Sequence, residues 1–200
     1  MNHAREQQRI DGIDLVNWFH SGAREVDAYR KYLNNINVFP VADGDTGTNL
    51  ITTMRAMVDQ ATRIRTFNDM ARNLSDSGLA NARGNSGIIF ASYINGLAVN
   101  GQQYESVDVR EFSTIVHQAV GHLYHAIEKP LEGTMISVIR DWASFLFDHR
   151  EVYQNFQDLL GAAYHHATES LKKTTSQMEV LRKYNVVDSG AAGFVRFLHG

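Results

Sequence analysis

The chain has 200 residues, of which 44% are hydrophobic and 20% are charged, and its mass is 22.5 kDa. These values are typical of one globular domain and exclude a disordered, a collagen-like or a coiled-coil chain. Nineteen Lys and Arg against 22 Asp and Glu give a net charge of −3, so no basic excess favours nucleic-acid binding. The absence of cysteine excludes disulfides, thiolate catalysis and Cys-based metal centres.

Targeting and membrane signals are not expected in this sequence. The first nine residues carry charges without a following apolar run, which does not match a signal peptide. No stretch approaches the ~18 consecutive apolar residues that a membrane span requires. We therefore expect a cytoplasmic protein without an integral membrane segment.

The spacing of apolar residues predicts helices along most of the chain. Apolar side chains recur at three- and four-residue intervals, whereas strict alternation is almost absent. The predicted helices cover residues 10–33, 47–64, 67–81, 86–99, 108–128, 134–148, 151–173 and 190–199. The segment 38–41 has β-like composition, but it is short and contains Pro40. The sequence therefore predicts one all-α domain over residues 1–200, without an internal linker.

Small residues lie on otherwise apolar helix faces, for example Gly87, Ala91 and Gly96. Close packing between helices explains such residues. The alternative is a central space that remains open for an apolar guest.

The loop before the second predicted helix carries the strongest chemical signal. It reads Asn37-Val-Phe-Pro-Val-Ala-Asp43-Gly-Asp45-Thr-Gly-Thr-Asn49. Two carboxylates in a loop can turn toward one cation, and oxygen-only ligands suit Mg²⁺ or Ca²⁺. The spacing does not fit a helix–loop–helix calcium site, which requires Gly at position six and Glu at position twelve. The residues after Asp45 begin a helix, where backbone N–H groups and the dipole favour an anion.

A phosphate bridged by a metal ion would reconcile the acidic loop with the anion-binding helix start. A simpler interpretation is that Asp45 or Thr48 caps the helix and that Gly44 makes a turn. Taken alone, this segment leaves both interpretations open.

Similar combinations of glycine with small polar residues precede three further helices. They are Ala82-Arg83-Gly84-Asn85-Ser86-Gly87, Glu132-Gly133-Thr134 and Asp188-Ser189-Gly190. Alternate helix ends of a bundle lie on one rim, so four such loops can meet around a polyanion. The common phosphate-binding loop and the Gly-x-Gly-x-x-Gly pattern are both missing from the sequence. A bound nucleotide would therefore require a different fold.

These four motifs, in this order, resemble the amino-terminal kinase domain of bacterial fatty-acid kinase. That domain is related to the ADP-binding subunit of dihydroxyacetone kinase. The motifs span residues 37–193, nearly the whole chain. The resemblance implies an eight-helix antiparallel barrel that holds ATP or ADP at one rim with two Mg²⁺ ions.

The resemblance also implies roles for individual residues. Asp43 and Asp45 would be metal ligands. Where dihydroxyacetone kinases have a third Asp upstream, this chain offers Asn34, Asn35 and Asn37, of which Asn37 is favoured as the third ligand. Phosphate contacts would come from Thr46, Gly47, Thr48, Asn49, Asn85, Ser86 and Gly87. The nucleoside would contact Gly133, Thr134, Met135, Asp188, Ser189 and Gly190. Ala42 and Leu50 stand where the fatty-acid kinase pattern usually has Pro and Met, and neither change touches a group with chemistry.

Arg83 is a candidate for a catalytic cation over the transferring phosphoryl group. The alternative is an ion pair between Arg83 and a neighbouring helix.

The resemblance implies phosphoryl transfer from ATP to a fatty acid that a separate binding subunit presents. A carboxylate acceptor is already ionised at pH 7 and needs no general base. Two alternatives are transfer to a small hydroxyl compound, as in dihydroxyacetone kinase, and a non-catalytic ADP-binding regulatory module. Fatty-acid kinases continue beyond this domain, so residues 1–200 would match the amino-terminal part of a longer protein. Homodimer formation is left open.

Overall fold

The computed structural model describes residues 8–59, 61, 64–126 and 130–200. Over these ranges the chain forms ten α-helices and no β-strand. The helices are α1 (Gly12–Ala28), α2 (Arg30–Asn35), α3 (Thr46–Asp59), α4 (Phe67–Asn81), α5 (Gly84–Gly101), α6 (Val109–Ala126), α7 (Met135–His149), α8 (Phe156–Gln177), α9 (Glu179–Tyr184) and α10 (Ser189–His199).

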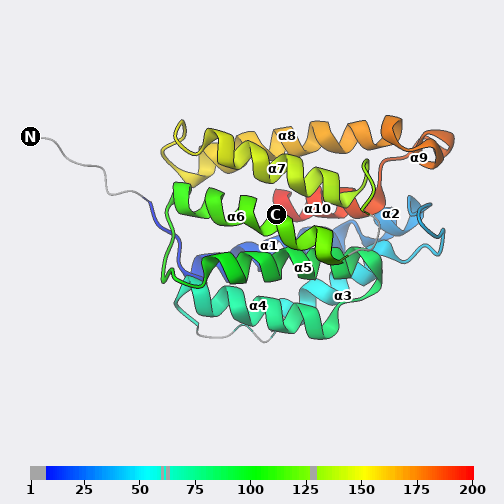
Figure 1. The fold of residues 1–200 in the computed structure, drawn as a ribbon. Helices are drawn as coiled ribbons and strands as arrows, with labels where there is room; N and C mark the ends of the chain where they lie inside the picture. The colour runs from blue at the N-terminus through cyan, green and yellow to red at the C-terminus, as the bar shows by residue number, and fades with distance from the viewer. Residues whose placement is uncertain (1–7, 60, 62–63, 127–129) are drawn as a thin grey trace, which may run out of the picture.

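The eight long helices close into an antiparallel barrel. Each long helix packs against the next one along the chain, and α10 returns to pack against α1. In Figure 1, α7 and α8 lie on one side of the barrel and α4 and α5 on the opposite side. The all-α eight-helix barrel expected from the sequence is therefore confirmed.

Two short helices extend the barrel at the rim on the right of Figure 1, and the sequence predicted neither of them as a separate element. The predicted helix 10–33 is interrupted at Tyr29, where α1 ends and α2 begins. The guanidinium of Arg196 on α10 lies 3.5 Å from the centre of the Tyr29 ring. The break places α2 across the start of α3 and buries Leu33 completely. Helices of six residues, such as α2 and α9, are too short for apolar periodicity to reveal them.

Most other helix boundaries differ from the prediction by a few residues. Helix α3 is Thr46–Asp59, and residues 60, 62 and 63 of the predicted helix 47–64 lie outside the described residues. Helix α8 begins at Phe156 rather than at 151. Asn155 sets the start of α8, because its side chain accepts the N–H of Asp158 at 2.9 Å. Residues 127 and 128, at the predicted end of 108–128, lie outside the described residues. Among residues 38–41 no strand forms.

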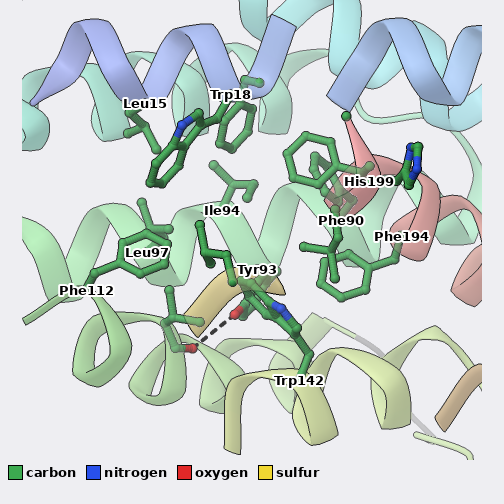
Figure 2. A pocket seen from close by; sticks show the side chains of 16 residues that line it. Leu15, Trp18, Phe90, Tyr93, Ile94, Leu97, Phe112, Trp142, Phe194 and His199 are labelled. Atoms are coloured by element: carbon green, nitrogen blue, oxygen red, sulfur yellow. Dashed lines mark hydrogen bonds between the residues drawn. The ribbon is translucent and has the colours of Figure 1, made fainter. Parts of the chain in front are cut away.

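The small residues serve close helix packing. A Cβ atom on Gly96 would lie 2.7 Å from the carbonyl oxygen of Ala119 on α6, and one on Gly87 would lie 2.5 Å from Thr53 Oγ1 on α3. The core nevertheless contains a cavity of about 270 Å³. Figure 2 shows that large side chains line this cavity, among them Trp18, Phe90, Tyr93, Trp142 and Phe194. Among the described residues, no helix combines the length and apolarity needed to cross a membrane.

Tyr93 is the polar anchor of this cavity wall. Its buried hydroxyl donates to the carbonyl of Val116 on α6 at 3.1 Å (Figure 2), and burial raises the pKa of Tyr93 well above its ordinary value. We expect Tyr93→Phe to lower the free energy of unfolding by about 1 kcal/mol, because a buried hydrogen bond is lost. Urea denaturation would measure the loss, with the exposed Tyr184→Phe as the unchanged control. Equal stability of wild type and Tyr93→Phe would contradict this expectation.

Candidate functional site

Two adjoining cavities open at the rim where helices α3, α5, α7 and α10 begin. The first, here called the acidic cavity, is lined by Asn37, Phe39, Pro40, Val41, Asp43, Asp45, Thr46, Asn49, Gly84, Asn85 and Ser86. The second, here called the mixed cavity, is lined by Phe39, Pro40, Asn85, Ser86, Ile89, Leu131, Thr134, Met135, Ile136, Asp188, Ser189 and Gly190. The two cavities adjoin because they share four lining residues. One extended ligand with two chemically different ends can therefore occupy both.

The acidic cavity contains a group of oxygen atoms that suits a hard cation. Asp43 and Asp45 both line it, and Gly44 between them has φ +68°, a conformation that favours glycine. The Asn37 amide donates from Nδ2 to Asp43 Oδ1 at 2.6 Å. Its Oδ1 atom is buried and has no hydrogen-bond partner among the described residues. An unmet buried acceptor costs about 1–3 kcal/mol, which a cation bound between these oxygens would relieve.

The donor set is compatible with Mg²⁺, because two carboxylates and an amide carbonyl supply only oxygen ligands. Among the described residues, no group of three or more His, Cys, Asp or Glu side chains gathers as a metal site. The fit to Mg²⁺ therefore depends on Asn37 as well as on the two carboxylates.

The start of α3 is only partly available to a ligand. Asn34 Oδ1 accepts the N–H of Thr48 at 3.1 Å, and Asn34 Nδ2 donates to Thr48 Oγ1 at 3.0 Å. A Cβ atom on Gly47 would lie 2.4 Å from the carbonyl oxygen of Arg30, so Gly47 allows α2 to approach α3. From this helix start, Thr46 and Asn49 line the acidic cavity. Gly47 and Thr48 are not among the described residues that line it.

The start of α5 faces both cavities through Asn85 and Ser86. Gly84 has φ +59°, and a Cβ atom there would lie 2.4 Å from Asn49 Nδ2 on α3. Within the described ranges, no side chain at the N-cap bonds to the first amides of α5. Exposed helix amides with the positive end of the dipole attract an anion.

Helices α7 and α10 begin around a buried carboxylate. Asp188 is 6% exposed and accepts the N–H groups of Ala191 on α10, at 2.7 Å, and of Met135 on α7. Its own N–H donates to Thr174 Oγ1 on α8 at 3.1 Å. Burial raises the pKa of Asp188 from 3.8 to about 6. The hydrogen bonds from the N–H groups of Ala191 and Met135 offset only part of the effect of burial.

Asp188 determines how charge is distributed along the rim. Its carboxylate already occupies the starts of α7 and α10, whereas the start of α5 carries no such group in the described structure. A polyanion is therefore favoured over α3 and α5, beside the acidic cavity. The uncharged part of the same ligand is favoured in the mixed cavity, against Met135 and Gly190.

Contacts between the helix starts hold the four motifs together. Ser189 Oγ on α10 donates to Thr46 Oγ1 on α3 at 3.1 Å, although 143 residues separate them. A Cβ atom on Gly190 would lie 2.9 Å from Ser86 Oγ on α5. The motifs that the sequence singled out are thus brought to one rim.

A family model described as the DAK2 domain matches residues 40–200 of the chain. The chain belongs to the DAK2 domain family. It is 31% identical over 196 residues to the "Uncharacterized protein MG369 homolog" of Mycoplasma pneumoniae, covering 94% of this chain and 35% of that protein. It is also 31% identical over 193 residues to "Protein YloV" of Bacillus subtilis, covering 96% and 35%. The chain thus spans about a third of the length of these curated relatives.

The fold of this DAK2 domain matches the crystal structure of the dihydroxyacetone kinase from C. freundii in complex with AMP-PNP and Mg²⁺. The TM-score is 0.69 at 16% sequence identity, and the match covers 100% of this chain and 35% of that one. At this identity the match shows a common fold.

Besides Gly47 and Thr48, three residues selected from the sequence do not line a described cavity of the DAK2 domain. Gly87 packs against Thr53, and Gly133 has φ +80° and packs against Gln177. Arg83 is exposed at the N-cap of α5, and its N–H donates to Thr53 Oγ1 at 3.1 Å.

Sequence reasoning missed the apolar walls and Asn34. Phe39 and Pro40 lie inside the quoted motif, yet only the structure shows that they line both cavities. Leu131 carries no periodic signal, because it stands alone in a loop. The sequence indicates Asn34 only as one possible metal ligand, whereas in the structure its side chain binds the start of α3.

Proposed function

We propose that this DAK2 domain binds ATP or ADP with Mg²⁺ at the rim and transfers the γ-phosphoryl group of ATP to a fatty acid held by a separate binding subunit. The observation that carries the proposal is the unpartnered, buried Oδ1 of Asn37 beside Asp43. It lies in the same cavity as the uncapped start of α5. A cation site next to an anion site is the arrangement that a metal–polyphosphate complex requires.

Asp43, Asp45 and Asn37 would hold the Mg²⁺ ions, of which we propose two. When bound, Mg²⁺ neutralises phosphate charge and so lowers the barrier to phosphoryl transfer. The α5 start with Asn85 and Ser86 would orient the phosphates. The mixed cavity would hold the nucleoside and exclude water from it.

The transfer requires no proton movement, because the acceptor carboxylate is already ionised at pH 7. An oxygen of the acceptor carboxylate forms a bond to the γ-phosphorus, and the bond from that phosphorus to the bridging oxygen of ADP breaks. ADP leaves with the bonding electrons, and the product is an acyl phosphate. Arg83, one residue before Gly84 of the acidic cavity, is proposed to contact the transferring group with its exposed guanidinium.

A fatty acid is favoured over other acceptors because the segment 37–41 before Asp43, and Thr46 after Asp45, resemble the fatty-acid kinase motif. The fold match to dihydroxyacetone kinase favours a second candidate, transfer to a small hydroxyl compound. A third candidate is an ADP-binding regulatory module, since Arg83 lines neither described cavity. ATP consumption measured with each acceptor, with and without an acyl-binding partner protein, separates the three.

Nucleotide binding tests the site directly. We expect ADP with Mg²⁺ to stabilise the wild type by about 2.7 kcal/mol at a hundredfold excess over Kd. Asp43→Ala/Asp45→Ala should lose this metal-dependent increase in Tm, because the cation ligands are gone. Thermal unfolding with ADP, with ADP and Mg²⁺, and with Mg²⁺ alone measures it.

The matched control is Asp76→Ala/Asp148→Ala, which removes two exposed carboxylates outside both cavities. This variant should keep the full stabilisation by ADP with Mg²⁺. A folded wild type whose Tm does not respond to nucleotide would refute the proposal. The four motifs would then be explained by helix capping alone.

A further inference from the structure

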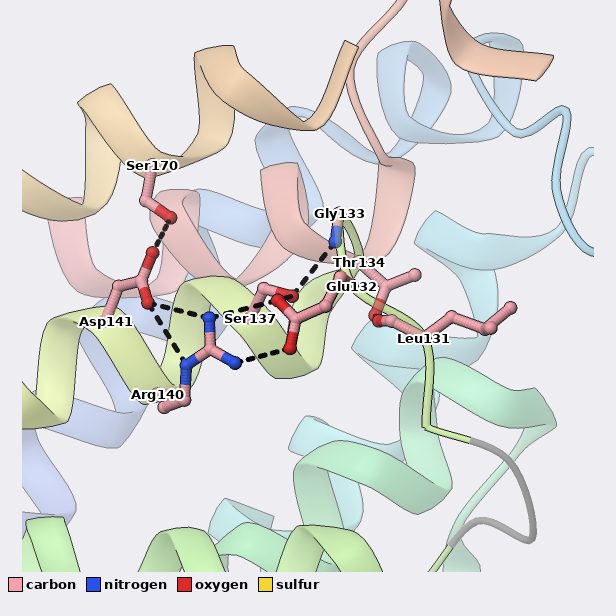
Figure 3. Close-up of polar contacts among 8 residues, drawn as sticks. All are labelled: Leu131, Glu132, Gly133, Thr134, Ser137, Arg140, Asp141 and Ser170. Atoms are coloured by element: carbon pink, nitrogen blue, oxygen red, sulfur yellow. Dashed lines mark hydrogen bonds and ion pairs between the residues drawn. The ribbon is translucent and has the colours of Figure 1, made fainter. Parts of the chain in front are cut away.

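The loop of residues 131–134 has one face toward the mixed cavity and one face toward helix α7. Leu131 and Thr134 line the cavity, and Thr134 Oγ1 donates to the carbonyl of Leu131 at 2.7 Å. Figure 3 shows Glu132 turned toward Arg140, while Leu131 extends away from it. Glu132 belongs to the Glu132-Gly133-Thr134 motif, and the proposed phosphoryl transfer assigns it no role.

The carboxylate of Glu132 fastens this loop to α7. Arg140 grips it with both Nη atoms, one of them donating to Oε2 at 3.0 Å (Figure 3). Ser137 Oγ donates to the same Oε2 at 2.9 Å and accepts the N–H of Gly133 at 3.0 Å. Both the side chain of Glu132 and the backbone of Gly133 are therefore held from one helix. The Arg140 guanidinium accordingly keeps the pKa of Glu132 below its ordinary value.

A second set of contacts extends the clamp to α8. Arg140 Nη2 also donates to Asp141 Oδ1 at 3.1 Å, and Asp141 Oδ2 accepts Ser170 Oγ on α8 at 2.6 Å. On the other side of the loop, Gly133 is pressed against the end of α8, where a Cβ atom would meet Gln177 Cβ at 2.8 Å. The loop is thus fixed against two helices.

This clamp contributes more to the shape of the loop than to the stability of the fold. The side chain of Glu132 is 64% exposed and that of Arg140 is 35% exposed. Exposed ion pairs add little to the free energy of unfolding. A two-point Arg–carboxylate grip does restrict geometry, and a loop held in its binding conformation loses less entropy when a ligand binds.

We propose that Glu132 and Arg140 are positioning residues that hold Leu131 and Thr134 in place as the wall for the nucleoside end of the ligand. This inference rests on the proposed function. The inference extends the proposed function, because it assigns recognition of the nucleoside to a clamp that does not itself contact the ligand. Phosphate binding, which belongs to the starts of α3 and α5, does not depend on this clamp.

Two probes separate nucleoside from phosphate recognition: ADP with Mg²⁺ and inorganic pyrophosphate with Mg²⁺. Isothermal titration would compare wild type, Glu132→Gln, Arg140→Gln and the conservative Arg140→Lys. We expect each Gln variant to weaken ADP binding about tenfold, which corresponds to about 1.4 kcal/mol. Pyrophosphate binding should stay within about twofold. Arg140→Lys should lose less ADP affinity than Arg140→Gln, because it keeps the charge beside Glu132.

Glu169→Gln is the matched control. Glu169 forms an exposed ion pair with Lys172 at 2.6 Å on α8, away from both cavities, and its loss should change neither affinity. Equal weakening of ADP and pyrophosphate, or unchanged ADP binding in both Gln variants, would overturn the inference while leaving the proposed function intact. A wild type that binds neither probe would overturn both.

Discussion

The free energy of unfolding of Asp188→Asn is expected to rise by about 2.4 kcal/mol relative to that of the wild type as the pH increases from 4 to 7. The pKa of Asp188 is about 6 in the folded protein against an ordinary value of 3.8, because the carboxyl group is buried. The folded state therefore binds this proton more tightly than the unfolded state does. The stability that this proton provides is complete only well below the unfolded pKa of 3.8 and is lost as the pH rises through 6, at about 1.4 kcal/mol per pKa unit.

Urea denaturation at pH 4, 5, 6 and 7 measures this difference. The stability of Asp188→Asn minus that of the wild type should rise with pH, since other titrating groups contribute to both proteins. Asp76→Asn, an exposed carboxyl on α4, should give a difference that stays flat. A flat difference for Asp188→Asn as well would show that its carboxyl group titrates as it does in water.

A buried charge at this position has a structural cost that the helix starts offset in part. The N–H groups of Met135 and Ala191 point at the carboxylate, and Thr174 fixes the backbone of Asp188. These bonds hold α7, α8 and α10 together at the rim. The residue that would direct a bound polyanion toward α3 and α5 therefore also joins three helices.

Gly96→Ala is expected to destabilise the barrel by about 2 kcal/mol, although alanine is the better helix former. A Cβ atom at Gly96 would lie 2.7 Å from the carbonyl oxygen and 2.8 Å from the Cα atom of Ala119. Both are backbone atoms of α6, so the clash is relieved only if α5 and α6 move apart. Guanidinium denaturation measures the loss.

Gly121→Ala provides the matched comparison on the neighbouring helix. No described atom lies within 4 Å of a Cβ built at Gly121, so the same substitution there should stabilise the protein by about 0.5–1 kcal/mol. Opposite signs for the two variants would confirm that Gly96 is required for helix contact. A gain in stability at both positions would contradict the packing of α5 on α6.

The helical class and the motif positions are local properties, and the sequence determined them. Side chains three and four residues apart share a helix face, so the periodicity shows each long helix without knowledge of its partners. The four glycine-containing helix starts are also visible locally, because the residue types that favour caps and tight turns are known. The alternation of directions in a bundle then places them on one rim.

The interior of the rim depends on contacts between distant residues, and only the tertiary structure decided it. Asn34 takes the N–H of Thr48, and Gly47 faces Arg30 rather than the cavity. Nothing within the motif indicates these partners, since α2 forms only where the predicted first helix breaks at Tyr29. Which side of a glycine meets a ligand and which meets a helix is set by packing across the fold.

The same division holds for the two groups that carry our proposals. The sequence identified Asn37 and Glu132 as members of motifs. The unpartnered oxygen of Asn37 and the grip of Arg140 on Glu132 arise from folding of the whole chain. Local sequence determined which residues stand at the rim, because residue type and periodicity act over one or two helical turns. The tertiary fold decided which of their atoms face a ligand, because burial and hydrogen bonding depend on helices that the local sequence does not contain.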